Sequence, residues 1–175
     1  MNTSIASIMR LIGVSAPIGP LQGWLSSDDF RHIVSHTPLV SMDFVITNPQ
    51  GEWLLGERLN RPAQGSWFVP GGRILKGETL DATALRLTQD ELGQSVPLSS
   101  MCFLGVYQHF YIDSMFDAEI STHYIVLAYQ LNIDIDLATL PRQQHGGYQW
   151  WPPGAIAQDQ RVHVNTRAYL PAVTL

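Results

Sequence analysis

The stretch GGRILKGETLDATALRLTQDELGQ, residues 71–94, decides the fold that we predict for this chain. Two glycines open it, and apolar residues then recur at three- and four-residue intervals, which predicts a helix over residues 79–92. Four residues share one face of this helix: Leu80, Ala84, Leu87 and Glu91. Gly93 supplies a stop signal at the C-terminal end.

Strand and helix signals alternate on both sides of this helix, with no internal repeat. Apolar and β-branched runs predict strands over residues 39–47, 53–59, 101–111 and 122–133, and a short strand leads into the Pro-Gly-Gly break of WFVPGG, residues 67–72. Further helices are predicted over residues 26–38 and 165–171. The mixture predicts the α/β (α+β) class, with one mixed sheet packed between helices.

Composition indicates one globular domain in a chain of 175 residues, 45% hydrophobic and 14% charged. We expect residues 1–22 to be a flexible extension and residues 23–175 to form the domain. The net charge of −5 excludes the basic footprint of a nucleic-acid-binding protein. No apolar run reaches membrane-spanning length, and Arg10 interrupts the N-terminal one, so we expect a cytoplasmic protein.

A single cysteine, Cys102, excludes an internal disulfide and fits a reducing compartment. It lies in the apolar run MCFLGV, so we expect it in the core.

Half of the ten Lys and Arg residues lie between positions 58 and 86: Arg58, Arg61, Arg73, Lys76 and Arg86. Such a local cluster of cations in an acidic protein suits a small phosphorylated ligand. The alternative is a set of solvated surface side chains. The predicted helix begins within this cluster and carries carboxylates at its far end, which favours a diphosphate and metal site.

The spacing of charged residues after Gly72 resembles the Nudix box, G-x5-E-x7-R-E-U-x-E-E-x-G-U, where U is a bulky apolar residue. Five positions match: Gly72, Glu78, Arg86, Glu91 and Gly93. Asp90 replaces a glutamate conservatively, and three positions depart from the pattern: Leu87, Thr88 and Gln94. The resemblance to the Nudix hydrolase family implies an α/β/α sandwich and hydrolysis of nucleoside diphosphate compounds.

Leu87 changes what this box can do. A hard cation such as Mg²⁺ takes oxygen ligands, and carboxylates one helical turn apart can converge on it. Glu91 has lost its partner one turn earlier because position 87 is leucine, so we expect one ion rather than a cluster. Water must then be activated by another group.

His145 is the candidate for that role. It lies in RQQHGGYQWW, a glycine-bearing loop before a strand, next to Gln144, whose amide oxygen suits Mg²⁺. Its unperturbed pKa near neutrality suits a general base, while the residues alone leave a surface histidine equally open. The other histidines are interpreted as packed in strands, for His109 and His123, or as surface residues, for His32, His36 and His163.

The chain from Trp24 onward is also similar to one branch of the Nudix family, the GDP-mannose mannosyl hydrolases. The segments that carry this resemblance are TPLVSMDFVI, GEWLLGERLNRPAQGSWFVPGGR, RLTQDELG, GVYQHFY, THYIVL and QHGGYQW. Leucine after the box arginine is itself a feature of the branch. The resemblance implies hydrolysis of GDP-mannose, and more slowly GDP-glucose, to GDP and free sugar, by water attack at the anomeric carbon with inversion.

The resemblance also implies roles for individual residues. The ligands of one Mg²⁺, with Mn²⁺ as a substitute, would be the main-chain carbonyl of Gly71, Glu91 and Gln144. His145 would be the general base. Arg58 and Arg73 would neutralise the departing GDP, while Arg86 and Tyr124 would support the diphosphate. Asp43 would face the sugar, and three residues would contact the nucleotide: Trp24, Leu25 and Phe30. The branch forms homodimers, which we expect here as well.

Structural alternatives stay open for several of these residues. Arg86 could pair with Glu78 to fasten the loop to the helix, with or without a catalytic role. Asp43 could cap a loop, Tyr124 could pack in the core, and Trp24 could cover the fold. Two other functions also stay open: a pyrophosphatase that attacks phosphorus, and a sensor of nucleotide sugars without catalysis. Leu87 and the Gln144–His145 pair count against the pyrophosphatase, and the retained Glu91, Gln144 and His145 count against the sensor.

Overall fold

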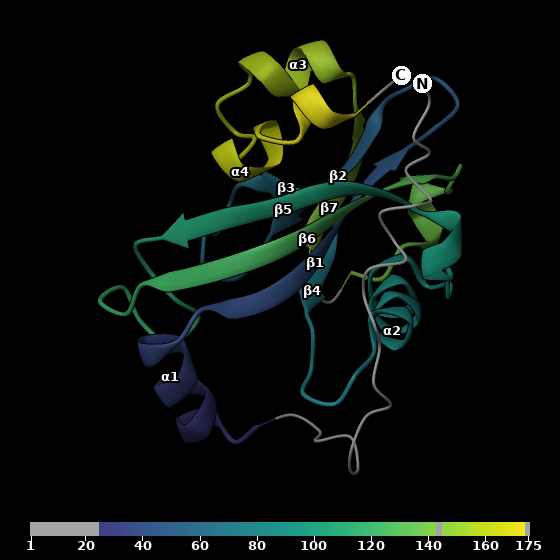
Figure 1. Ribbon diagram of the computed structural model, residues 1–175. Coiled ribbons are helices and arrows are strands. Elements are labelled where there is room, and N and C mark those ends of the chain that lie inside the picture. The colour runs from purple at the N-terminus through teal and green to yellow at the C-terminus, as the bar shows by residue number, and fades with distance from the viewer. Residues whose placement is uncertain (1–24, 143–144, 174–175) are drawn as a thin grey trace, which may run out of the picture.

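The computed structural model describes residues 25–142 and 145–173 (Figure 1). Its helices are α1 (Ser27–His36), α2 (Leu80–Leu92), α3 (Pro153–Gln158) and α4 (Val164–Arg167). Its strands are β1 (Leu39–Thr47), β2 (Trp53–Arg58), β3 (Trp67–Phe68), β4 (Gly71–Arg73), β5 (Cys102–Tyr111), β6 (Thr122–Asn132) and β7 (His145–Trp151). Residues 1–22 lie outside the described residues.

The seven strands form one mixed sheet with the order β3-β2-β1-β6-β5, while β4 pairs with β1 and β7 pairs with β2. Strands β1 and β6 are parallel over the whole length of β1, from Leu39 opposite Tyr124 to Thr47 opposite Asn132. The other pairs are antiparallel. The sheet therefore places β1 at its centre, and β4 begins beside Asp43.

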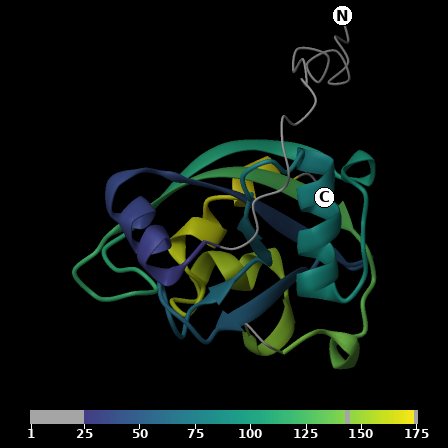
Figure 2. The same cartoon turned by 90° about the horizontal axis from the view of Figure 1, so that it is seen from below.

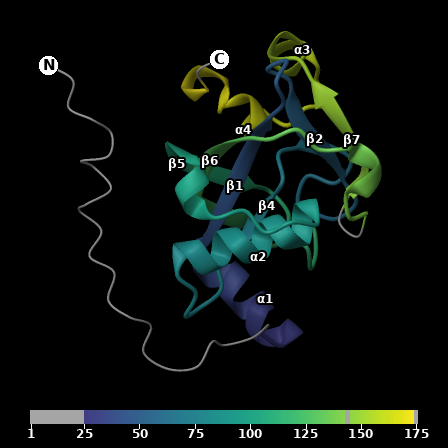
Figure 3. The ribbon, with the colours of Figure 1, turned by 90° about the vertical axis from the view of Figure 1, so that its right-hand side faces the viewer.

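Alternation along β1 divides the core into two layers, because successive side chains of a strand point to opposite faces. Met42, Phe44 and Ile46 pack on the face that carries α2. Val45 packs on the opposite face, with Ile156 of α3 among others. Figure 3 shows α2 in the lower part of the molecule and α3 and α4 at the top. The predicted sheet between helices is confirmed.

Local signals set the ends of the two longer helices. Ser26 and Thr79 cap α1 and α2, and each side-chain oxygen accepts a hydrogen bond from a backbone N–H of the first turn. Gly93 ends α2 in the left-handed region, at φ 73°. Figure 2, seen from below, shows α1 on the left and α2 on the right, with part of the chain visible between them. Both helices therefore lie where the sequence predicts them.

The C-terminal helices differ from the prediction. The helix expected over residues 165–171 ends at Arg167, because Pro171 has no N–H to donate to the carbonyl of residue 167. A short 3₁₀ turn, Leu170–Ala172, follows it. Helix α3, which begins at a proline after Pro152, is absent from the prediction.

Two further predictions are corrected near the sheet edges. The run WFVPGG forms two strands rather than one, because Pro70 cannot continue a ladder and the chain passes from β2 to β1 there. Cys102 is exposed instead of buried in the core, since β5 is the outermost strand of the sheet. Over the described residues, every helix is too short or too polar to cross a membrane.

Candidate active site

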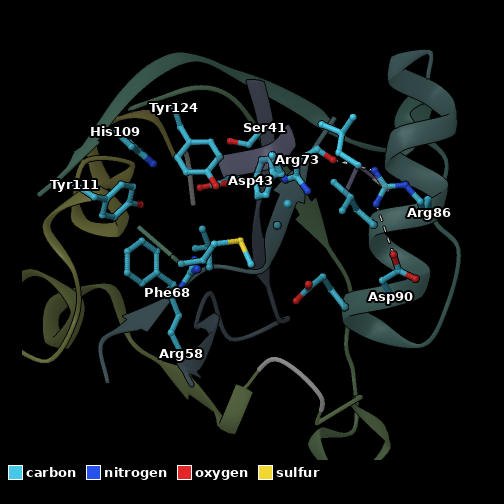
Figure 4. Close-up of a pocket in the computed structure, with 18 of the residues that line it drawn as sticks. Ser41, Asp43, Arg58, Phe68, Arg73, Arg86, Asp90, His109, Tyr111 and Tyr124 are labelled. Atoms are coloured by element: carbon cyan, nitrogen blue, oxygen red, sulfur yellow. Dashed lines mark hydrogen bonds and ion pairs between the residues drawn. The ribbon is translucent and has the colours of Figure 1, made fainter. Parts of the chain in front are cut away.

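A cavity of about 480 Å³ opens between α1, α2 and the sheet, and its size suits a small organic ligand. Helix α1 contributes Phe30, β1 contributes Asp43, and α2 contributes Glu91. Further lining residues come from β2 to β6 and from the loop between β5 and β6. Figure 4 shows Arg86 and Asp90 reaching the cavity from α2, opposite His109 and Tyr124.

Two arginines give the cavity its positive charge. Arg58 ends β2, and its guanidinium carbon lies 5.4 Å from the centroid of the Phe68 ring. Arg73 ends β4 and stacks on Phe30, at 3.6 Å from the ring centroid. Burial lowers the pKa of Arg73, although an arginine stays protonated in any case. Arg58, Arg73 and Phe30 therefore all line this one cavity.

The Glu78–Arg86 pair fastens the loop after β4 to α2. Arg86 donates from Nε to Glu78 Oε1 at 2.6 Å, and from Nη2 to Glu78 Oε2 at 2.8 Å. Arg86 Nη2 also donates to the main-chain oxygen of Arg73 at 2.9 Å. The Arg86 side chain holds the pKa of the Glu78 carboxyl below its usual value. The structural alternative for Arg86 is thus confirmed, and the residue lines the cavity as well.

Leu87 occupies the place of the missing glutamate. Its side chain is 4% exposed and lies over Gly72, where an added Cβ would come within 2.6 Å of Leu87 Cδ2. Asp90 is exposed and lies 3.6 Å from Arg86 Nη1. The wall beside Glu91 is therefore apolar at the position where the box carries a carboxylate.

The residues around Glu91 fit a single hard cation. Glu91 is 2% exposed and lines the cavity together with Gly71. The backbone of Gly71 is tightly cradled, since an added Cβ would lie 2.5 Å from the main-chain oxygen of Met42. Among the described residues, no three His, Cys, Asp or Glu side chains gather as a metal site. A carboxylate and a main-chain carbonyl remain as candidate ligands, while Gln144 lies outside the described residues.

His145 begins β7 rather than lying in a loop, which corrects the sequence-based interpretation. The imidazole is 7% exposed, and its Nε2 lies 3.0 Å from Glu91 Oε2. Its Nδ1 is buried and has no hydrogen-bond partner among the described residues. The ring lies 5.0 Å from the Tyr148 ring, and His145 is not among the residues that line the cavity. The imidazole thus contacts Glu91, which lines the cavity, without lining the cavity itself.

A buried hydrogen-bonded chain lies at the end of the cavity away from α2. Tyr169 Oη donates to Asp43 Oδ2 at 2.8 Å and lies 3.2 Å from His109 Nε2. Burial raises the pKa of Asp43 to about 6, and burial lowers the pKa of His109 to about 4. His109 is packed and hydrogen-bonded, as predicted, but it also lines the cavity. Tyr169 is the residue that the sequence interpretation missed.

The remaining predicted residues divide into three groups. Leu25 and Tyr124 line the cavity, and Trp24 lies outside the described residues. His163, expected at the surface, is partly buried and stacks on Phe68, with ring centroids 4.5 Å apart. Burial and the nearby Arg58 lower the pKa of His163 to about 4.

Comparison with known proteins agrees with this arrangement. The NUDIX domain profile matches residues 37–173, which is more than half of the chain. The low-salt glycan biosynthesis protein Agl8 of Haloferax volcanii is 39% identical over 129 residues, covering 74% of this chain and 81% of that protein.

Two solved structures share the fold. The MutT protein of Methanosarcina mazei superposes with a TM-score of 0.62 at 20% identity, covering 78% of this chain and 93% of that one. The MutT NUDIX hydrolase of Burkholderia pseudomallei gives a TM-score of 0.62 at 24% identity, covering 79% of this chain and 100% of that one. The profile match and the relative at 39% identity establish that the chain belongs to the Nudix family.

Proposed function

We propose that this Nudix hydrolase cleaves GDP-mannose, and more slowly GDP-glucose, to GDP and free sugar, by water attack at the anomeric carbon. Members of the family generally use divalent metal ions and bind nucleoside diphosphate compounds. The finer assignment combines the sequence resemblance to the mannosyl hydrolase branch with the chemistry of the cavity. A relative whose name places it in glycan biosynthesis is consistent with a nucleotide-sugar substrate.

The single observation that carries the proposal is the apolar contact of Leu87 with Gly72. Attack at phosphorus in this family relies on several carboxylates of the box to assemble metal ions and a water nucleophile. Here the position one turn before Glu91 offers a buried methyl group instead. The wall that would hold a second ion against the phosphorus is thus apolar. Cleavage of the C–O bond does not require a second ion at this wall, because the site has to bind only the leaving diphosphate.

Arg58 and Arg73 supply the charge that a leaving diphosphate needs. A guanidinium group can donate two parallel hydrogen bonds to the oxygens of a phosphate group. It also stabilises the negative charge that develops on GDP in the transition state. A divalent cation bound between Glu91 and the carbonyl of Gly71 would add to this neutralisation. GDP then leaves without a general acid, so the second carboxylic acid of ordinary glycosidases is unnecessary.

His145 is the proposed general base. A carboxylate oxygen of Glu91 accepts the proton of Nε2, which leaves the lone pair on Nδ1 to accept a proton from water. Glu91 has further lone pairs that can bind a cation, so its carboxylate can accept the hydrogen bond from His145 and bind the cation at the same time. To reach a water in the cavity, the imidazole has to turn past Glu91. Gly146 and Gly147, which follow it in β7, carry no side chains that would hinder this motion.

The competing function is a pyrophosphatase that attacks phosphorus, which the family membership alone would also allow. A third possible function is a sensor without catalysis, and the retained Glu91 and His145 count against it. We also propose that the protein acts as a homodimer in the cytoplasm, as the branch resemblance implies.

Proton NMR of the running reaction tests the proposal. GDP-mannose carries an α-linked sugar, so inversion gives β-mannose first, and α-mannose then accumulates only by mutarotation. Early α-mannose would contradict inversion, and mannose 1-phosphate would identify a pyrophosphatase.

His145→Gln should lower kcat far more than it weakens substrate binding, because a general base acts in the transition state. Unchanged turnover would remove His145 from this role. Glu91→Gln should weaken the dependence on Mg²⁺, and an unaffected metal titration would count against this metal site.

A further inference from the structure

Tyr169, in the C-terminal segment, does not line the cavity but contacts residues that do. Its ring is fully buried among apolar side chains that include Val45, Ile156 and Val162. Its hydroxyl group reaches two residues that line the cavity, Asp43 and His109. These partners lie 126 and 60 positions earlier in the chain, on β1 and β5.

The number of protons fixes the direction of the hydrogen bonds. A phenolic hydroxyl has one proton to donate, and an ionised carboxylate can only accept. Tyr169 therefore donates to Asp43 Oδ2 and accepts a proton from Nε2–H of His109. This arrangement holds the imidazole as its neutral Nε2–H tautomer. The second Asp43 oxygen, Oδ1, lies on the Gly71 side, where a Cβ on that glycine would come within 2.7 Å.

Packing alone does not account for this hydroxyl group. A phenylalanine would fill the same apolar surroundings, and it would avoid the cost of burying a hydroxyl group. Tyr107 meets the Tyr169 ring edge-on, with centroids 4.7 Å apart, and this contact involves only the rings. The hydroxyl group is thus explained by its two partners in the cavity wall rather than by the core.

We propose that Tyr169 is a positioning residue for the sugar end of the cavity. Its hydroxyl group holds Asp43 and His109 as a prealigned pair, so that Asp43 Oδ1 is aimed to accept a hydrogen bond from a sugar hydroxyl. Prealignment matters because a rotated carboxylate would lose both its partner and its direction toward the ligand. This inference rests on the proposed function, since it takes the ligand to be a nucleotide sugar.

The test compares Tyr169→Phe with the matched control Tyr107→Phe, which removes a hydroxyl group from the neighbouring ring. Loss of a hydrogen bond to a carboxylate should lower kcat/KM for GDP-mannose roughly ten- to hundredfold in Tyr169→Phe. Affinity for GDP, which lacks the sugar, should stay the same within twofold by calorimetry. The control should match the wild type in both measurements. Wild-type turnover by Tyr169→Phe, or an equal loss of affinity for GDP, would overturn the proposal.

A double-mutant cycle with Asp43→Asn shows whether Tyr169 acts through Asp43. The ten- to hundredfold cost of Tyr169→Phe should shrink to less than threefold in the Asp43→Asn background. An equal cost in both backgrounds would overturn the positioning role.

Failure of the proposed function has a different signature. If the wild type does not hydrolyse GDP-mannose, that function is lost, and binding then decides the inference. Tyr169→Phe should then reduce the ratio of the affinity for GDP-mannose to the affinity for GDP. An unchanged ratio would overturn the positioning role of Tyr169.

Discussion

Glu78→Gln should destabilise this protein far more than a similar change in an exposed ion pair. The Glu78 carboxylate accepts two hydrogen bonds from Arg86, at 2.6 and 2.8 Å, one from the backbone N–H of Leu75 at 2.9 Å and one from Thr83 Oγ1 at 3.0 Å. Its side chain is 7% exposed, whereas that of Arg86 is 24% exposed. The glutamine would present an amide N–H to the guanidinium group, which leaves a partly buried cation without its counter-charge.

Removing one partner of a fully buried pair costs about 3–5 kcal/mol, and the partial exposure of Arg86 lowers our expectation to about 2–3 kcal/mol at pH 7. Urea denaturation followed by tryptophan fluorescence measures this change. Asp159→Asn is the matched control, because Arg161 binds Asp159 through hydrogen bonds of 2.7 to 3.2 Å at the protein surface. Surface pairs contribute little to stability, so the control should unfold like the wild type.

The pH dependence gives a second check on the same pair. Arg86 lowers the pKa of folded Glu78 below its ordinary value of 4.5. The stabilisation by this carboxylate is therefore fully present above pH 4.5 and is lost as the pH falls through the lower pKa of the folded state. The difference between the wild type and Glu78→Gln should shrink in acid. A cost equal to that of Asp159→Asn at pH 7 would refute the reasoning.

Two further predictions concern the histidines. Gly56→Ala would place a Cβ 2.4 Å from His145 Nδ1, so it should destabilise the protein by about 1–3 kcal/mol and displace the imidazole from Glu91. Gly147→Ala, with open space around the new Cβ, is its control in the same urea titration, and equal costs would contradict the prediction. His163 has a folded pKa of about 4 and an ordinary value of 6.5, so its neutral form stabilises the fold above pH 6.5 and this contribution is lost as the pH falls toward 4. His163→Asn does not titrate and still caps α4, so it should lose about 1–2 kcal/mol less than the wild type between pH 7 and pH 4.5. Parallel stability curves for the two proteins would rule this out.

The sequence predicts helix α2 to within one residue, because its signals are local. The periodic face of Ala84, Leu87 and Glu91 is buried, and Gly93 adopts the left-handed conformation that ends the helix. The density of basic residues between positions 58 and 86 marks the segment, whereas the family resemblance singles out Arg58 and Arg73 within it. Short-range patterns therefore predict α2 and the basic segment beside it, which supply one side of the cavity.

The other end of the site depends on contacts that no local pattern encodes. Tyr169 meets Asp43 across 126 positions, and nothing in its own segment marks it as different from a core tyrosine. His145 was predicted in a loop, yet it pairs with Glu91 inside the fold because β7 adds to β2 next to α2. The split of WFVPGG into β3 and β4 likewise depends on which neighbour each half finds in the sheet.

The central claim is that water attacks carbon, and the most direct test is hydrolysis of GDP-mannose with Mg²⁺ in ¹⁸O-labelled water. Phosphorus NMR reads the position of the label, because ¹⁸O shifts the resonance of the phosphorus that carries it. We expect GDP without the label, because no phosphorus–oxygen bond breaks or forms when water attacks carbon. Labelled GDP would show attack at phosphorus with mannose leaving. Labelled GMP or labelled mannose 1-phosphate would show attack at phosphorus within the diphosphate, and the protein would then be a pyrophosphatase despite Leu87.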